Sequence, residues 1–336
     1  MWSLQVLVLV LHLEQQLFAG TKVIAMNSNF TEFSKIVDLV IAKSPFQKKK
    51  LDQYFSKMDS QFFIRAEEFA TDYGGYLTSQ GMTFDYAVKA YLDMCKSMLK
   101  CQIEFMKTGT YGSSDSDQAF IEVYSNPQFM KSYMIALALS QFLWPTHYQI
   151  FLDFERSLIK SVSNINSYLE IGPGHGLYLR KAIQYLNAVS GIYAVDISPV
   201  SIEISKSIIS YFYPKKTNIT FWTGDIFAYE APLQFDFITI GEVLEHVNTP
   251  LQLLSRIVDL LSDSGNAFIT TSINSPAIDH VYHFKSVNDV RKMICDSGLQ
   301  IMDENILPVE DLPMEEIIIR RITINYSAVV AKVKKK

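Results

Sequence analysis

The sequence predicts an α/β protein whose doubly wound, mostly parallel seven-stranded sheet has an antiparallel edge strand and follows an all-helical N-terminal segment. After Ser163, short apolar runs alternate with helical stretches, which is the pattern of a parallel sheet with helices on both faces. The last two extended stretches have no full helix between them, which indicates a hairpin at the sheet edge. Before Ser163, apolar residues recur at helical spacing and strand signals are few.

The second half of the chain supplies the sheet. Five short apolar runs bounded by turns are predicted strands, at residues 167–171, 191–195, 219–222, 235–240 and 267–271. Helices are predicted between them at residues 177–187, 199–211, 250–261 and 287–296. Residues 299–307 and 317–333 are the two final extended stretches, and the last is expected to run antiparallel to its neighbours.

The first half is predicted to be helical, at residues 30–41, 49–57, 61–73, 84–106, 118–140 and 147–162. Thr83 is a candidate N-cap for the fourth of these helices. We therefore expect three parts: an uncertain leader at 1–26, a helical cap or substrate domain at 27–162, and a cofactor-binding domain at 163–336.

The leader has a nearly apolar stretch at residues 4–13, but no Lys or Arg precedes it and it is too short to span a bilayer. Three interpretations stay open: a packed or frayed leading helix, a weak targeting segment, or residues ahead of a start at Met26.

Composition excludes several classes of protein. Hydrophobic residues make up 49% and charged residues 19%, which is ample for a core. The net charge of -5 argues against a nucleic-acid partner. Three cysteines (Cys95, Cys101 and Cys295) make no disulfide framework or zinc motif, and reduced thiols fit a cytoplasmic protein. We expect neither a nucleic-acid partner nor a membrane.

A glycine-rich turn follows the first predicted strand. Gly172, Gly174 and Gly176 stand at every second position, and a helix begins near Leu177. Glycines permit positive φ and close approach of a ligand, and the helix N-terminus adds amide donors. Taken alone, such a triplet is also compatible with an ordinary strand-to-helix turn. Its spacing differs from the G-x-G-x-x-G of dinucleotide enzymes.

Polar residues also stand at the ends of the following predicted strands. Asp196 ends the second strand, where an ionised carboxylate can accept both ribose hydroxyls of a nucleoside. Asp225 follows the third strand, and Gly241 with Glu242 follows the fourth. Each could instead be a surface residue that caps a helix, and Asp196 could equally serve a dinucleotide.

Together, Glu170, the glycines and the ordered acidic residues resemble the class I (Rossmann-like) S-adenosylmethionine-dependent methyltransferases over roughly residues 165–333. The resemblance implies S-adenosyl-L-methionine as cofactor. It implies an adenine contact at Asp225, with the next apolar residue packed on the ring. The cofactor-binding residues it implies are Glu170, Gly172, Gly174, Gly176, Asp196, Ile197, Asp225, Ile226, Gly241 and Glu242.

The segment after the fourth strand has a second possible function. On a helix, Glu242, Glu245 and His246 would point the same way, and two carboxylates with an imidazole can bind a divalent cation. The pattern resembles ubiquinone-pathway O-methyltransferases and small-RNA 2'-O-methyltransferases, where these positions hold magnesium. His280 or His283 would be a fourth ligand. In the alternative, metal-free case, these side chains orient substrate or stabilise the turn.

Methyl transfer to a small-molecule acceptor by in-line displacement is the expected reaction. The candidate bases are His246, His280 and His283, and a metal is the alternative means of activating a hydroxyl. In the first half, Tyr124, Tyr133, Trp144 and His147 are expected to pack the helices against the sheet, with substrate contact as the alternative. A nicotinamide-dependent oxidoreductase and a non-catalytic cofactor-binding module are the competing functions.

Overall fold

The computed structural model describes residues 30–112, 115, 123–124, 126–186, 191–216 and 218–333. The predicted leader lies outside these residues, as do residues 118–122 of a predicted helix. By packing, the chain divides after Thr71 into two compact units, which are described separately. The division falls inside helix α4 (Ser60–Ser79), while the expected boundary near residue 163 stays a prediction of domain organisation.

The first unit contains α2 (Thr31–Lys43), α3 (Gln47–Phe55) and the start of α4. Phe30 precedes α2 and has no side chain able to cap it. Instead, the Glu67 carboxylate accepts the backbone N–H groups of Glu32 and Phe33 at 3.0 and 2.9 Å. This contact satisfies two of the four donors that a helix start leaves unpaired, and it ties α4 to α2.

The second unit begins with helices and continues into the sheet. Its helices include α5 (Phe84–Thr108), α7 (Pro127–Leu143) and α8 (Pro145–Ser161), followed by the short 3-10 turn η2 (Val162–Asn164). Thr83 caps α5 as predicted, because its hydroxyl accepts the Tyr86 N–H at 3.3 Å. Pro145 begins α8, where a missing N–H costs nothing.

The sheet has seven strands in the order β3-β2-β1-β4-β5-β7-β6. The strands are β1 (Ser167–Ile171), β2 (Gly191–Asp196), β3 (Ile219–Thr223), β4 (Phe235–Gly241), β5 (Leu261–Ile273), β6 (Leu299–Pro308) and β7 (Ile324–Lys332). The first five pair in parallel, and β7 lies antiparallel between β5 and β6. The predicted mostly parallel sheet with an antiparallel hairpin at its edge is confirmed.

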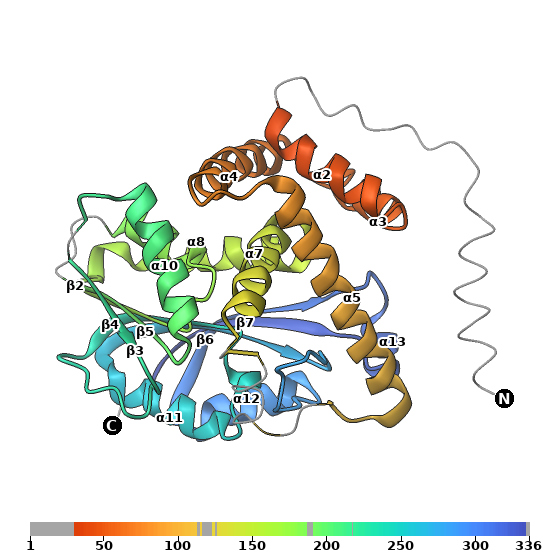
Figure 1. Ribbon diagram of the computed structural model, residues 1–336. Coiled ribbons are helices and arrows are strands. Elements are labelled where there is room, and N and C mark those ends of the chain that lie inside the picture. Colours follow the sequence, from red (N-terminus) through yellow and green to blue (C-terminus); the bar gives the residue numbers. More distant parts are fainter. Residues whose placement is uncertain are drawn as a thin grey trace. The chain divides into compact units, whose positions relative to one another are not determined.

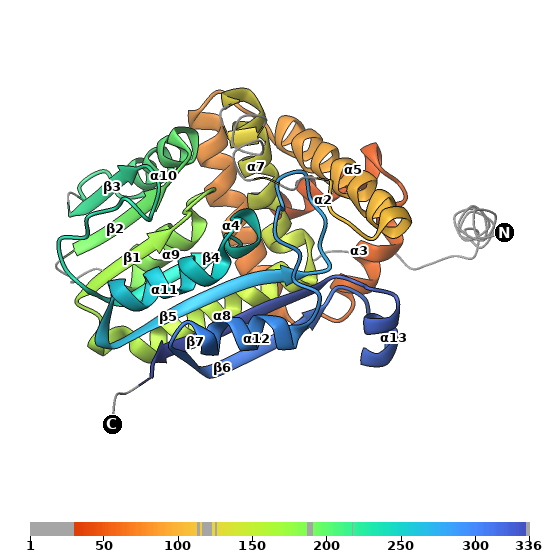
Figure 2. The ribbon, with the colours of Figure 1, turned by 90° about the horizontal axis from the view of Figure 1, so that it is seen from below.

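Helices cover both faces of this sheet (Figures 1 and 2). The helices between the strands are α9 (Leu177–Tyr185), α10 (Pro199–Phe212), α11 (Pro250–Leu260) and α12 (Val287–Asp296). Within this unit, α7, α8 and α10 lie above the sheet and α11 and α12 lie below it in the view of Figure 1. The five residues of β1 are all buried between the two layers, as expected of a central parallel strand.

One predicted element is wrong. The stretch at 317–333 was expected to be extended throughout, but Met314–Ile319 form a short helix, α13, and the strand begins at Ile324. Pro313 stands just before this helix, and Glu315 and Glu316 lie in its first turn, which favours a helix start. Among the described residues no helix is long and apolar enough to cross a membrane. The three cysteines are free thiols.

Candidate active site

The glycine turn lies at the carboxyl end of β1, beside the end of β2. The Gly172 N–H donates to Val195 O at 2.8 Å. Gly172, Gly174 and Gly176 have φ values of 70°, 49° and 72°, which disfavour any side chain. A Cβ at Gly172 would stand 2.6 Å from Val243 Cγ2. The turn is therefore closely packed at the start of α9 and leaves no room for side chains at these three positions.

Asp196 faces this turn from the end of β2. Its Oδ1 accepts the Ser198 N–H at 2.8 Å, and the backbone N–H of Gly174 also interacts with its carboxylate. Burial raises the pKa of Asp196 to about 6. The Asp196 carbonyl accepts the Gly224 N–H at 2.9 Å, which fixes the exit of β3 beside the same edge. The carboxylate thus sits where the glycine turn and the next strand end meet.

The other predicted cofactor contacts differ in environment. Glu170 is buried and accepts the Tyr168 hydroxyl at 2.7 Å, and burial raises the pKa of Glu170 to about 8. Its carboxyl therefore supports the turn from inside the fold. Asp225 is exposed and accepts the Phe227 N–H at 3.0 Å. Ile197 is exposed, whereas Ile226 packs in the core.

Of the two possibilities for the segment of Glu242, Glu245 and His246, a helix or a turn, the structure has the turn. β4 ends at Gly241, Glu242 has a left-handed φ of 51°, and Leu244–His246 form only a 3-10 turn, η3. The Glu242 N–H donates to the Thr270 hydroxyl at 2.9 Å, which holds this bend against β5. α-Helical geometry resumes only with α11 at Pro250. The three side chains therefore do not share a helix face.

A titratable cluster nevertheless forms at this turn. One ligand atom from each of Glu245, His246 and His280 lies within 4.8 Å of the others. The loop that carries His280 is held here because Val281 and Tyr282 both donate their N–H groups to Glu245 O at 2.9 Å. The rings of His246 and His280 meet edge to face, with centroids 4.7 Å apart. Two residues from this turn thus join one from beyond β5.

The cluster lies among buried carboxyl groups. Burial raises the pKa of Glu242 and of Glu245, and their interaction raises the pKa of Glu245 further. Burial lowers the pKa of His280 to about 4, so this imidazole is neutral at pH 7. Buried Oε1 of Glu242 and Oδ1 of Asp279 have no hydrogen-bond partner among the described residues. Neutral imidazole, carboxylates and unpaired buried oxygens are a donor set that fits a divalent cation.

The structure does not bring His283 into this cluster. Its Nε2 lies 2.9 Å from Asn274 Oδ1, and its ring packs against Phe105 and Tyr111 with centroids 5.1 and 4.6 Å away. The Tyr111 hydroxyl accepts the Ser275 N–H at 2.8 Å. His283 therefore belongs to an aromatic contact between the α5 end and the loop after β5, and stays only a prediction as a base.

Two contacts of the cluster were not expected from the sequence. The Tyr124 hydroxyl lies 2.9 Å from His246 Nδ1 and donates to Asp279 Oδ2 at 2.9 Å. The sequence signal for Asp279 is its position next to His280 in the loop after β5. Thr271 also contributes, because its hydroxyl donates to Glu245 Oε2 at 2.8 Å.

The remaining aromatic candidates pack among the helices. His147 Nδ1 lies 2.8 Å from the Ser140 hydroxyl, and the Trp144 indole donates to the Tyr91 hydroxyl at 2.8 Å. Burial lowers the pKa of His147 to about 4. Tyr133 stacks on Phe129 with centroids 5.8 Å apart. These contacts agree with the expected packing role.

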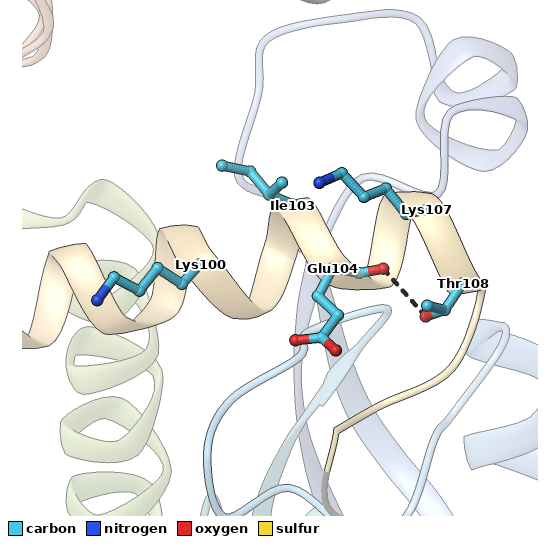
Figure 3. Close-up of a pocket in the computed structure, with 5 residues that line it drawn as sticks. All are labelled: Lys100, Ile103, Glu104, Lys107 and Thr108. Carbon is cyan, nitrogen blue, oxygen red and sulfur yellow. Dashed lines mark hydrogen bonds between the residues drawn. The ribbon is translucent and has the colours of Figure 1, made fainter. Parts of the chain in front are cut away.

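A shallow groove elsewhere on this unit is separate from the site. Lys100, Ile103, Glu104, Lys107 and Thr108 line it along α5, where the Thr108 hydroxyl donates to Glu104 O at 3.0 Å (Figure 3). None of these residues is part of the glycine turn or a strand end.

Comparison of the sequence with known proteins matches part of this chain to a family. Residues 147–296 match a family model described as a methyltransferase domain. The mitochondrial ubiquinone biosynthesis O-methyltransferase of Schizosaccharomyces pombe is 31% identical over 103 residues, 31% of this chain and 36% of that protein. Its counterpart in Xanthomonas campestris pv. campestris is 30% identical over 109 residues, 32% of this chain and 44% of that protein. The chain spans less than half the length of these relatives.

Two solved structures share the fold. The mitomycin 7-O-methyltransferase MmcR has a TM-score of 0.51 and 11% identity, covering 74% of this chain and 70% of that chain. PigF with SAH has a TM-score of 0.51 and 14% identity, covering 74% and 73%. Both likenesses concern the fold alone. Residues 147–296 of this chain therefore match a methyltransferase domain, and the two solved structures share its fold.

Proposed function

We propose that this methyltransferase transfers the methyl group to a hydroxyl oxygen of a small-molecule acceptor bound at the ends of β4 and β5. The cluster of Glu245, His246 and His280 carries this proposal, because a hydroxyl must lose its proton on methylation and this cluster can receive it. The cluster also lies beside Glu242, directly after the strand that neighbours the glycine turn.

Cofactor binding is assigned to the edge formed by β1 and β2. S-adenosylmethionine supplies the methyl group as an activated sulfonium, so the chain's main task is to position it. The glycine turn offers a backbone surface without side chains, and Asp196 offers a carboxylate that can accept two ribose hydroxyls. Asp225, exposed beyond β3, is the proposed acceptor for the adenine amino group.

Acceptor activation is assigned to the cluster itself. His246 and His280 are the proposed bases, because in both a backbone carbonyl engages Nδ1 while Nε2 has no hydrogen bond within the described part of the chain. Glu245, with Glu242 beside it, would hold a divalent cation together with the two imidazoles. Such a cation would lower the pKa of the acceptor hydroxyl.

The relatives' names support the oxygen as the methylated atom. The similar ubiquinone biosynthesis enzymes and the mitomycin enzyme are named O-methyltransferases. Their names concern those proteins, and the aligned part covers less than half of the ubiquinone enzymes. The net charge of -5 adds an argument against an RNA acceptor.

Methyl transfer can be tested without knowing the acceptor. Purified protein is incubated with methyl-labelled cofactor and a small-molecule extract, and the labelled product is identified by mass spectrometry. We expect a labelled ether, formed roughly 100-fold more slowly with Glu245→Gln. Label on nitrogen or carbon, or in an RNA or protein fraction, would contradict the proposed acceptor class.

The metal has a separate test. Protein purified without chelator should contain a divalent ion by elemental analysis, and chelation should reduce transfer. Glu245→Gln should lower Mn²⁺ affinity measured by calorimetry. Unchanged transfer after chelation and unchanged Mn²⁺ binding in Glu245→Gln would assign the cluster to base catalysis without metal.

A further inference from the structure

We infer that Asp279, held by Tyr124, is a positioning residue that fixes His246 with its proton on Nδ1 and its free lone pair on Nε2. This inference rests on the proposed function, because it concerns how His246 is prepared as base or metal ligand. It adds two residues to the site: Asp279, from the loop after β5, and Tyr124, from the segment before α7.

The oxygen atoms around His246 Nδ1 determine where its proton sits. The Asp279 carbonyl lies 3.0 Å away and can only accept a hydrogen bond. Asp279 Oδ2 lies 3.4 Å away, and the Tyr124 hydroxyl lies 2.9 Å away. Because Tyr124 donates its own proton to Asp279 Oδ2, it offers only an acceptor to the ring. All three neighbours therefore favour a proton on Nδ1.

Asp279 is built for this contact. Its side chain is 1% exposed. Its position is fixed because Val281 and Tyr282, which follow in the same loop, both donate their N–H groups to Glu245 O. Tyr124 supplies the hydrogen bond that a buried carboxylate needs at Oδ2. The second oxygen, Oδ1, has no partner among the described residues. A carboxylate kept buried at this cost indicates a role beyond packing.

The same arrangement recurs at the neighbouring histidine. His280 Nδ1 lies 2.6 Å from Ser275 O, which likewise places its proton on Nδ1. Both imidazoles then have Nε2 available, in a cluster that includes the Glu245 carboxylate. Hydrogen bonds from the remote ring nitrogen are known to fix the tautomer and raise the basicity of a ligand histidine. Tyr124 and Asp279 would fix the tautomer of His246 in this way.

The direct test is the tautomer of His246, read from ¹⁵N chemical shifts of the full chain without added metal or acceptor. We expect Nδ1 protonated and Nε2 unprotonated in the wild type. Asp279→Asn can turn an amide donor toward Nδ1, so it should populate the opposite tautomer. Tyr213→Phe is the matched control, since it removes a tyrosine hydroxyl that donates to Arg180 O and that contacts neither His246 nor Asp279 among the described residues.

Mn²⁺ affinity, measured by calorimetry with the metal alone, is the second readout. Loss of such an outer contact typically costs about 10- to 100-fold in metal affinity. We expect this loss in Asp279→Asn and a smaller one in Tyr124→Phe. If Asp279→Asn does not fold, Tyr124→Phe still tests the inference, because the Nδ1 proton signal should move when its hydroxyl neighbour is removed.

The outcomes separate this inference from the proposed function. A wild-type His246 protonated on Nε2, or an unchanged tautomer in Asp279→Asn, would overturn the inference whatever the enzyme methylates. The expected tautomer in a protein that binds no Mn²⁺ would keep the inference for a general base and contradict only the metal.

Discussion

The proposed cofactor half and the proposed acceptor half of the site are built in different ways. The cofactor half uses backbone at the end of β1 and one carboxylate at the end of the adjacent strand, β2. The acceptor half brings together the η3 turn, β5, the loop after β5 and a tyrosine from before α7. The residues proposed to bind the cofactor follow from local sequence motifs. The residues proposed to bind the acceptor come together only through tertiary contacts.

The largest expected effect is the loss of cofactor binding. In Gly172→Ala, the new Cβ meets Val243 Cγ2 at 2.6 Å and the residue keeps a φ of 70°. We expect S-adenosylhomocysteine binding to fall below detection by calorimetry and the protein to lose about 1–3 kcal/mol of stability.

Gly81→Ala is the matched control for this change. Gly81 has a φ of 69°, but a Cβ there would meet nothing within 4 Å. It should cost a similar backbone strain and leave cofactor affinity unchanged. Equal loss of affinity in both variants would show that the clash at Gly172 has no special role.

Glu245→Gln should slow methyl transfer and leave cofactor affinity unchanged. The amide keeps the size of the side chain and can still accept the Thr271 hydroxyl, but it can neither take up a proton nor bind a cation as a carboxylate does. We expect a fall in transfer rate of roughly 100-fold, in the range of lost acid–base groups, with S-adenosylhomocysteine affinity within about twofold of wild type. A parallel loss of affinity would show that the two halves are not separable.

The pH dependence of cofactor affinity tests the role proposed for Asp196. Its pKa of about 6 means that the carboxylate becomes protonated below pH 6 and loses acceptor capacity for the ribose hydroxyls. S-adenosylhomocysteine affinity should therefore fall as pH decreases from 7.5 to 5. Asp196→Asn should lower affinity at pH 7.5 by about 10-fold, the value of one charge-assisted hydrogen bond, and flatten the pH dependence. An equally steep profile in the variant would assign the effect to another group.

The smallest expected effect concerns the neutral histidines. Burial lowers the pKa of His147, His175 and His280 to about 4, below the 6.5 of an exposed imidazole. Their contribution to stability is therefore complete above pH 6.5 and is lost as pH falls through 4. Denaturant unfolding between pH 7 and 4.5 should show this decline, and His147→Gln should make it shallower. An identical decline in the variant would argue against His147.

The sequence by itself determined the fold and the residues of the proposed cofactor half. The alternation of apolar runs and helical stretches predicts the parallel sheet, because each strand and each helix must bury its own apolar face. Gly172, Gly174 and Gly176 are visible because backbone conformation is a local property, and Asp196 is visible because it ends a strand. These features depend on neighbours only a few residues away.

Only the tertiary structure decided how the acceptor half is assembled. Helical spacing suggested a shared face for Glu242, Glu245 and His246, but the left-handed bend at Glu242 replaced the helix with one 3-10 turn. The chain separations are 122 residues from Tyr124 to His246 and 33 residues from His246 to Asp279. No local pattern encodes such contacts, because they form only when helices and strands distant in sequence pack together.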